Sequence, residues 1–181
     1  MTTTEAPPVL LETARLRLRR FTDSDAEALV EMHSDPEVMR HLGGWFRTNG
    51  LPPTVEWTRE VQLRQWIEEY ETNGPLSRWA LETREDRRFL GAFMLVLRYR
   101  YGLCEVGWRL PRHAWGQGYA TEAASAMIDK AFAELGVDRV VAIATAANTA
   151  SINIMKKCGM VFMKNYDNPP FGPAVEYVRD R

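Results

Sequence analysis

Two glycines one residue apart, Gly116 and Gly118, stand directly before a long alanine-rich run in the segment HAWGQGYATEAASAM (residues 113–127). Glycine lets a ligand come close to the backbone, and a helix N-terminus offers unpaired N–H groups that attract phosphate. The segment therefore fits a phosphate-binding loop, and it fits a plain tight turn equally well. A Walker motif is excluded because no Gly-Lys-Ser/Thr follows, and Thr121 in the third glycine position argues against a dinucleotide fingerprint.

A second segment, NTASINIMKKCGMVF (residues 148–162), follows the next apolar strand. Its presence favours the phosphate-binding loop over the plain tight turn. Together the two segments resemble the GCN5-related N-acetyltransferase (GNAT) family, whose members carry Q/R-x-x-G-x-G/A and, downstream, N-x-x-A/S-x-x-L-Y-x-K-x-G-F. The first signature falls on Trp115, Gly116, Gln117, Gly118, Tyr119 and Ala120, and the second on Asn148, Ser151, Ile154, Met155, Lys157, Gly159 and Met160. The opening TARLRLRRFTDSDAEALVEMHSDPEVMRHL also resembles the RimJ/RimL-like branch, the ribosomal-protein N-terminal acetyltransferases. The resemblance covers residues 11–179 and is thinnest over residues 43–57.

The resemblance implies a binding site for acetyl-CoA, the cosubstrate of the family. Backbone groups along the strand at Trp108, Arg109 and Leu110 would contact the pantetheine arm and polarise the thioester. The pyrophosphate would be held by N–H groups of the loop and first helical turn, at Gly116, Gln117, Gly118, Tyr119, Ala120 and Thr121. Asn148 would hydrogen-bond the pantetheine arm.

Direct attack of an amine on the thioester needs a base for the amine and an acid for the departing thiolate. Met155 stands where many relatives have the tyrosine acid, and a thioether donates no proton. Ser151, one turn beyond Asn148, is the candidate acid, with packing against the cofactor as the alternative. Glu105, on the strand expected to line the cleft, is the candidate base, with a solvated strand glutamate as the alternative.

The periodicity of apolar residues predicts the elements that must position these groups. Strands are expected at residues 15–21, 77–84, 87–100, 103–110, 138–146, 161–166 and 174–180, and helices at 22–33, 58–74, 118–135 and 148–159. Val61, Leu63, Trp66, Ile67 and Tyr70 are expected to form the apolar face of the second helix. The fold class is α/β of a mixed, α+β-like kind, with a mostly antiparallel twisted sheet and about four helices. The resemblance adds strands splayed apart at the cofactor. One domain is expected over residues 9–181, after a flexible stretch at 1–8.

The segment GGWFRTNGLPPTVEW (residues 43–57) is longer than a connection between two helices requires. Disordered segments are poor in aromatic residues, so its composition favours an ordered flap. In the family this connection borders the acceptor side of the cleft. We therefore expect Trp45, Phe46 and Arg47 to bind the acceptor, with a loop pinned by its aromatic residues or a dimer contact as the alternative.

The composition excludes several other classes of function. The formal net charge is −1, with 23 basic and 24 acidic residues, which disfavours non-specific nucleic-acid or membrane binding. The two cysteines, Cys104 and Cys158, stand in unrelated contexts, and the three histidines match no metal spacing, so we expect no disulfide framework and no metal. No signal peptide or membrane span is evident, which predicts a cytoplasmic protein.

The resulting hypothesis is an acetyl-CoA-dependent N-acetyltransferase that acts on a peptide or protein N-terminus or on a small-molecule amine. A homodimer is left open. Two alternatives remain: a different donor such as succinyl-CoA, and a non-catalytic acyl-CoA-binding module, which the missing tyrosine would suit. A tight turn in an unrelated α/β domain is disfavoured by the paired motifs.

Overall fold

The computed structural model describes residues 7–42, 50–98, 103–167 and 172–181, apart from the side chains of Arg98 and Tyr166. The described strands form one sheet in the order β1-β2-β3-β4-β5-β6-β8-β7. They are β1 (Val9–Glu12), β2 (Leu16–Arg19), β3 (Arg78–Thr83), β4 (Phe89–Arg98), β5 (Leu103–Arg109), β6 (Arg139–Thr145), β7 (Val161–Asp167) and β8 (Pro173–Asp180). Every neighbouring pair is antiparallel except β5 and β6, which run parallel. The predicted mixed, mostly antiparallel sheet is confirmed.

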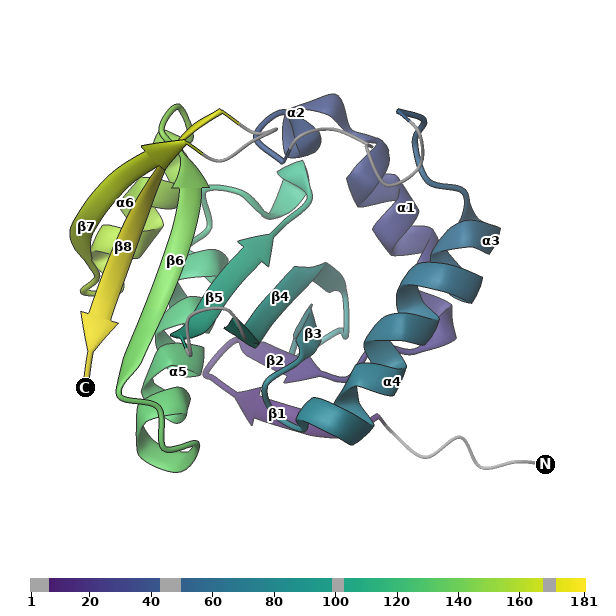
Figure 1. The fold of residues 1–181 in the computed structure, drawn as a ribbon. Coiled ribbons are helices and arrows are strands. Elements are labelled where there is room, and N and C mark those ends of the chain that lie inside the picture. The colour runs from purple at the N-terminus through teal and green to yellow at the C-terminus, as the bar shows by residue number, and fades with distance from the viewer. Residues whose placement is uncertain (1–6, 43–49, 99–102, 168–171) are drawn as a thin grey trace.

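Two groups of helices cover the sheet. They are α1 (Ala26–Ser34), α2 (Pro36–Met39), α3 (Val55–Trp57), the π-helix η3 (Thr58–Leu63), α4 (Arg64–Asn73), α5 (Tyr119–Glu134) and α6 (Thr149–Lys157), with short 3-10 turns η1 (Asp23–Asp25) and η4 (Arg112–Ala114). The group α1–α4 lies along one face, and α5 with α6 lies against the other (Figure 1). Within the described ranges, none of the helices combines the length and apolar character needed to cross a bilayer.

Two short elements were not expected from the sequence. β1 extends the sheet beyond β2, although the residues before it are rich in proline and threonine. α2 begins at Pro36 because the Asp35 side chain accepts a hydrogen bond from the N–H of Glu37 and because proline suits the first helical position.

The second predicted helix begins earlier than expected and carries a different buried face. Thr54, rather than Thr58, supplies the N-cap, and its side chain accepts a hydrogen bond from the N–H of Trp57. The π-helix η3 then changes the helical spacing. Val61 is consequently 49% exposed, contrary to expectation, whereas Gln62 is buried.

The parallel pairing of β5 with β6 is short. It involves only two pairs of partners, Cys104 with Val140 and Glu105 with Val141. β5 nevertheless pairs with β4 along its whole length, and β6 does the same with β8. The two strands therefore diverge beyond Glu105, as Figure 1 shows. The predicted splay of strands is present between these two.

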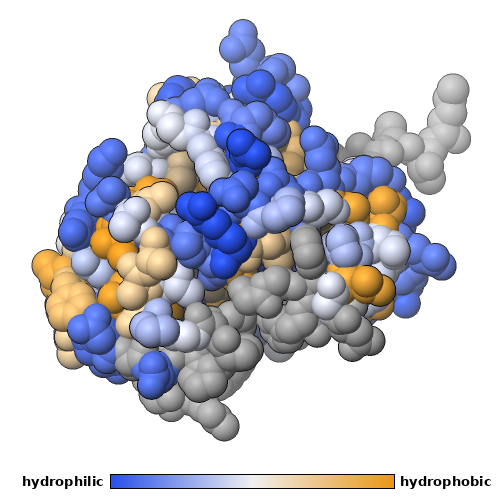
Figure 2. Space-filling model, turned by 90° about the horizontal axis from the view of Figure 1, so that it is seen from above, coloured by the Kyte–Doolittle hydropathy of each residue, from blue (hydrophilic) through white to orange (hydrophobic). Residues whose placement is uncertain are grey.

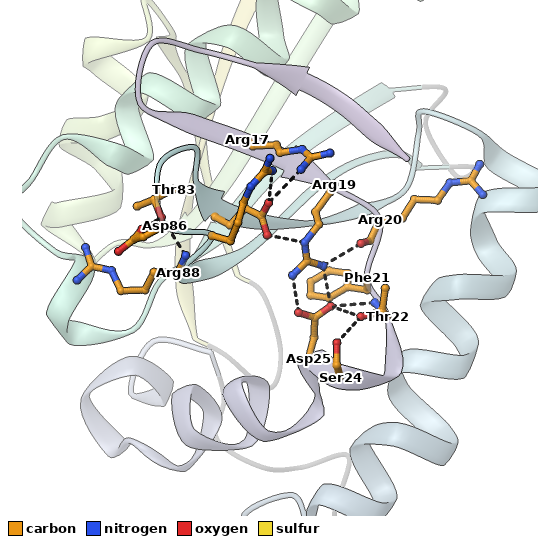
Figure 3. A network of polar contacts seen from close by, with 12 residues as sticks. Arg17, Arg19, Arg20, Phe21, Thr22, Ser24, Asp25, Thr83, Asp86 and Arg88 are labelled. Atoms are coloured by element: carbon orange, nitrogen blue, oxygen red, sulfur yellow. Dashed lines mark hydrogen bonds and ion pairs between the residues drawn. The ribbon is translucent and has the colours of Figure 1, made fainter. Parts of the chain in front are cut away.

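A buried ionic network fixes the start of α1 on the sheet (Figure 3). Arg19 on β2 donates from Nε to Glu82 on β3 at 2.6 Å and from Nη2 to Asp25 at 2.7 Å. Burial alone would lower the pKa of Arg19, but its bonds to Asp25 and Glu82 raise that pKa above the usual value. Because Asp25 is the N-cap residue of α1, the network holds this helix against β2 and β3.

Candidate active site

The loop between β5 and α5 is held by hydrogen bonds of its own. The indole Nε1 of Trp115 donates to the carbonyl of Leu110 at 2.8 Å, and Nε2 of Gln117 donates to the carbonyl of His113 at 2.7 Å. Gly116 and Gly118 have φ values of +74° and +80°, in the left-handed region that favours glycine. The loop is therefore a tight turn, and this turn leads directly into a helix.

Gly118 is the N-cap of α5, the longest helix among the described residues. The first intrahelical bond runs from the N–H of Glu122 to the carbonyl of Gly118. The N–H groups before it at the helix start have no partner within the helix, and they carry the positive end of its dipole. Residues 115–118 are exposed. The arrangement is thus accessible and suited to an anionic group such as a phosphate.

The opening between β5 and β6 starts after Glu105 and extends along β5 toward this loop. Val106–Arg109 have no partner in the β5–β6 ladder, so the backbone of β5 borders the opening there. Trp108 is half-buried on the α5 side, with its ring centroid 6.5 Å from that of Phe93, and Leu110 is buried. Trp108, Arg109 and Leu110 are the three strand residues predicted to line the cofactor. Leu110 belongs to the main hydrophobic core, and Trp108 packs against that core.

α6 begins at the end of β6, across the opening from β5. The side chain of Asn148 caps the helix, because its Oδ1 accepts a hydrogen bond from the N–H of Ser151 at 3.1 Å. Ser151 is half-buried in the first helical turn. Met155, at the position of the family tyrosine, is only 1% exposed and belongs to the main core. The side chain at that position therefore packs in the protein interior.

Glu105 lies at the last paired position of β5, where the opening starts. Cys104 and Val106 belong to the core beneath α5, so strand alternation directs Glu105 to the other face. Its side chain is 5% exposed, so the alternative of a solvated glutamate is wrong. Glu105 and α6, which carries Ser151, thus lie on opposite faces of the sheet.

Two histidines that the sequence gave no reason to select lie at the two sides of this opening. Nε2 of His33 on α1 is 2.7 Å from Nη1 of Arg109 on β5, and Nδ1 of His41 is 3.2 Å from Oγ1 of Thr145 at the end of β6. Arg109 therefore points toward α1, on the same face as Glu105. The segment from α1 to just beyond α2 spans both strands where they no longer pair.

The protonation of His33 follows from its surroundings. Burial, and then the positive charge of Arg109, lower the pKa of His33 to about 3. The ring is neutral at pH 7, and since arginine only donates, Nε2 accepts and the proton resides on Nδ1. On the other face of the sheet, burial, with a contribution from the adjacent Glu105, raises the pKa of the Cys104 thiol to about 11. The thiol is therefore unsuited to act as a nucleophile at neutral pH.

The residues predicted to bind the acceptor, Trp45, Phe46 and Arg47, lie outside the described residues. Among the residues that are described, no group of three or more His, Cys, Asp or Glu side chains is arranged to hold a metal ion.

The sequence matches the family model of the acetyltransferase (GNAT) domain over residues 15–161. The chain belongs to the GNAT acetyltransferase family. It is 31% identical, over 96% of its length and 74% of the relative, to a protein of Aspergillus fumigatus named FsC-acetyl coenzyme A-N(2)-transacetylase. It is 32% identical, over 85% of its length and 86% of the relative, to the uncharacterised protein YkkB of Bacillus subtilis.

Solved GNAT structures share this fold. One of them is RimL, a ribosomal L7/L12 α-N-protein acetyltransferase solved in complex with coenzyme A. This match has a TM-score of 0.79 and covers 96% of this chain and 98% of that chain, with 14% sequence identity. Membership of the family supports acyl transfer from an acyl-CoA to an amine in general terms.

The neutral state of His33 predicts a pH dependence of folding stability in this GNAT protein. The pKa of His33 is lower in the folded chain than in the unfolded one, so the unfolded state binds the additional proton. Stability is therefore lost as pH falls below about 6.5, by about 2 kcal/mol at pH 5. In His33→Gln the fall in the free energy of unfolding between pH 7 and pH 5, measured by urea titration, should be smaller by that amount.

His113→Gln is the matched control, because His113 is exposed on η4. Its fall between the two pH values should equal that of the wild type. Identical pH dependence in the wild type and His33→Gln would show that His33 is not held neutral.

Proposed function

We propose that this protein transfers the acetyl group of acetyl-CoA to a primary amine, either a peptide or protein N-terminus or a small-molecule amine. The observation that carries the proposal is the opening between β5 and β6 beside the N-terminus of α5. The N-terminus of α5, suited to an anion, lies on one face of the sheet there, and the buried carboxylate of Glu105 lies on the other.

The donor would lie on the α5 and α6 side. Gly116–Thr121 would hold the pyrophosphate by their N–H groups, and the backbone at Trp108, Arg109 and Leu110 would follow the pantetheine arm. Since Asn148 Oδ1 already caps α6, its amide nitrogen is the group left to reach the pantetheine. An N–H of β5 at the opening would stabilise the oxyanion that forms on the thioester carbonyl.

The amine would approach from the α1 side, where Glu105 lies. An alkyl ammonium has a pKa of about 10 and is therefore protonated at neutral pH. It must lose a proton before its nitrogen can attack. Glu105 would accept that proton, directly or through water, and Ser151 would donate one to the departing CoA thiolate. Trp45, Phe46 and Arg47 would complete the acceptor pocket. The described surface at this end of the sheet carries hydrophilic residues interspersed with hydrophobic patches (Figure 2).

Release of free CoA is the decisive assay. We expect thiol release from acetyl-CoA only when an amine is present, with a panel that includes N-terminal peptides, polyamines and amino compounds. A parallel series with succinyl-CoA tests the donor. If CoA binds with micromolar affinity but neither donor releases thiol with any member of the panel, the protein is a binding module, as the buried Met155 would allow.

Gly118→Asp should weaken acetyl-CoA binding by about 100-fold, because it adds a negative charge at the N-terminus of α5. A Cβ there would lie 3.5 Å from Nη2 of Arg15, so the added carboxylate would also compete for the guanidinium that bonds the Gln117 carbonyl. Calorimetry measures the affinity directly. Gly136→Asp is a matched control: Gly136 follows the other end of α5, has a φ of +66°, and a Cβ there would meet nothing within 4 Å. Equal affinities in the two variants, both folded, would place the donor elsewhere.

Glu105→Gln should lower kcat/KM at pH 7 by about 100-fold or more, within the usual range for loss of a general base. The deficit should shrink as pH rises, because solvent then deprotonates the amine. The pH profile of kcat/KM with a good acceptor measures both effects, and Glu85→Gln, in the exposed turn after β3, serves as control. A variant profile that superimposes on that of the wild type would remove Glu105 from the mechanism.

A further inference from the structure

The turn between β1 and β2 is bonded to the first turn of α5, more than 100 residues away in the sequence. The Glu122 carboxylate accepts hydrogen bonds from the hydroxyl of Thr13 and from the backbone N–H of Arg15. The Arg15 guanidinium adds two more contacts with Oε2 of Glu122, from Nε at 2.8 Å and from Nη2 at 2.7 Å. We call the four residues Thr13, Arg15, Gln117 and Glu122 the hairpin clamp.

Arg15 also bonds the glycine loop itself. Its Nη1 donates to the carbonyl of Gln117 at 3.1 Å, and its guanidinium lies 4.8 Å from the ring centroid of Tyr119. In a trans peptide the C=O and the following N–H point in opposite directions. Because the Gln117 carbonyl points toward Arg15, the N–H of Gly118 must point away from it. Arg15 therefore determines the direction of an N–H in the loop.

The clamp also balances charge at this helix terminus. Burial alone would raise the pKa of Glu122, but its bonds from Thr13 and Arg15 lower that pKa below the usual value. Glu122 is therefore ionised at neutral pH and would repel a second anion in the first turn of α5. The guanidinium of Arg15 offsets this charge, and each of its three nitrogens contacts either Glu122 or Gln117.

We propose that Arg15 is a positioning residue for the diphosphate of an acyl-CoA. It orients the Gln117–Gly118 peptide and neutralises Glu122, so that the start of α5 accepts the diphosphate. The inference rests on the proposed function for the identity of the ligand. It assigns a role in donor binding to the N-terminal hairpin, which lies outside both segments that suggested the donor site.

The test compares two donors that differ in their phosphates. With acetyl-CoA, Arg15→Met should raise KM by about tenfold or more, the effect of losing a charge-assisted hydrogen bond. With S-acetylpantetheine, which has no diphosphate, KM should not change. Arg139→Met is the matched control, because Arg139 also forms an exposed two-bond pair, with Asp180, at the far end of α5. It should leave both KM values as in the wild type.

Two further variants separate orientation from charge. Glu122→Gln removes the charge and replaces one carboxylate oxygen with an NH2 group, so it cannot accept from both Thr13 and the Arg15 guanidinium. Because Arg15 can still donate to the Gln117 carbonyl, KM for acetyl-CoA should rise less in Glu122→Gln than in Arg15→Met. The double variant Arg15→Met with Glu122→Gln should remain impaired, because the Gln117 carbonyl is still released. Full recovery in the double variant would overturn the orienting role of Arg15.

The outcomes separate the two proposals. Equal losses with both donors in Arg15→Met, or no loss with either, would overturn the role of Arg15 and leave the proposed function standing. Absence of turnover by the wild type with both donors would overturn the proposed function instead. Calorimetry with CoA and pantetheine then decides the inference: it requires weaker CoA binding in Arg15→Met, with pantetheine binding unchanged. If Arg15→Met fails to fold, Arg15→Lys takes its place, because one ammonium cannot hold both the Gln117 carbonyl and Glu122 as the guanidinium does.

Discussion

The short parallel ladder between β5 and β6 is the constraint on which the site depends. Two residue pairs hold the strands together, and beyond Glu105 and Val141 each strand continues with its other neighbour alone. A continuous ladder would pair the backbone of Val106–Arg109 with β6, whereas here that edge of β5 has no partner in β6. The ladder stops at Glu105, and α6, which carries Ser151, begins beyond the free end of β6 on the opposite face of the sheet.

Beyond Glu105, β5 and β6 no longer bond to each other, and their positions depend on contacts from outside the sheet. Here the segment running through α1 and α2 reaches both sides, with His33 against Arg109 and His41 against Thr145. α1 is in turn fixed by Asp25 and Arg19, deep in the N-terminal half of the sheet. A buried ion pair contributes little net stability but is costly to break, so such a network specifies position more than it adds stability. The histidine that contacts Arg109 is neutral, so this contact adds no second positive charge to the face on which Glu105 lies.

The sequence was sufficient for the sheet and for the long helices because their apolar periodicity is regular. The start of α5 at Gly118 and its end near Gly136 are marked by glycines that both have positive φ. Three features could not be predicted from periodicity. β1 has only four residues, α2 depends on a local Asp35 cap, and the π-helix shifts Val61 to the surface. The contact of His33 with Arg109 joins residues 76 positions apart, and no local pattern encodes such a pair.

The same distinction applies within the candidate site. Glycine spacing indicates where a backbone can approach a phosphate, but it does not indicate which way each N–H points. Peptide orientation is set by whatever bonds the carbonyl on the other side, and for Gln117 that group is a guanidinium from the first hairpin of the sheet. A loop of two glycines is otherwise among the most adaptable stretches of a chain, and ordering it only when a ligand binds would reduce affinity. The contact from Arg15 holds the Gln117 carbonyl in the structure without a ligand, so a ligand at this loop would meet a peptide that is already oriented. The two glycines would then supply access, and residues outside the motif would supply direction.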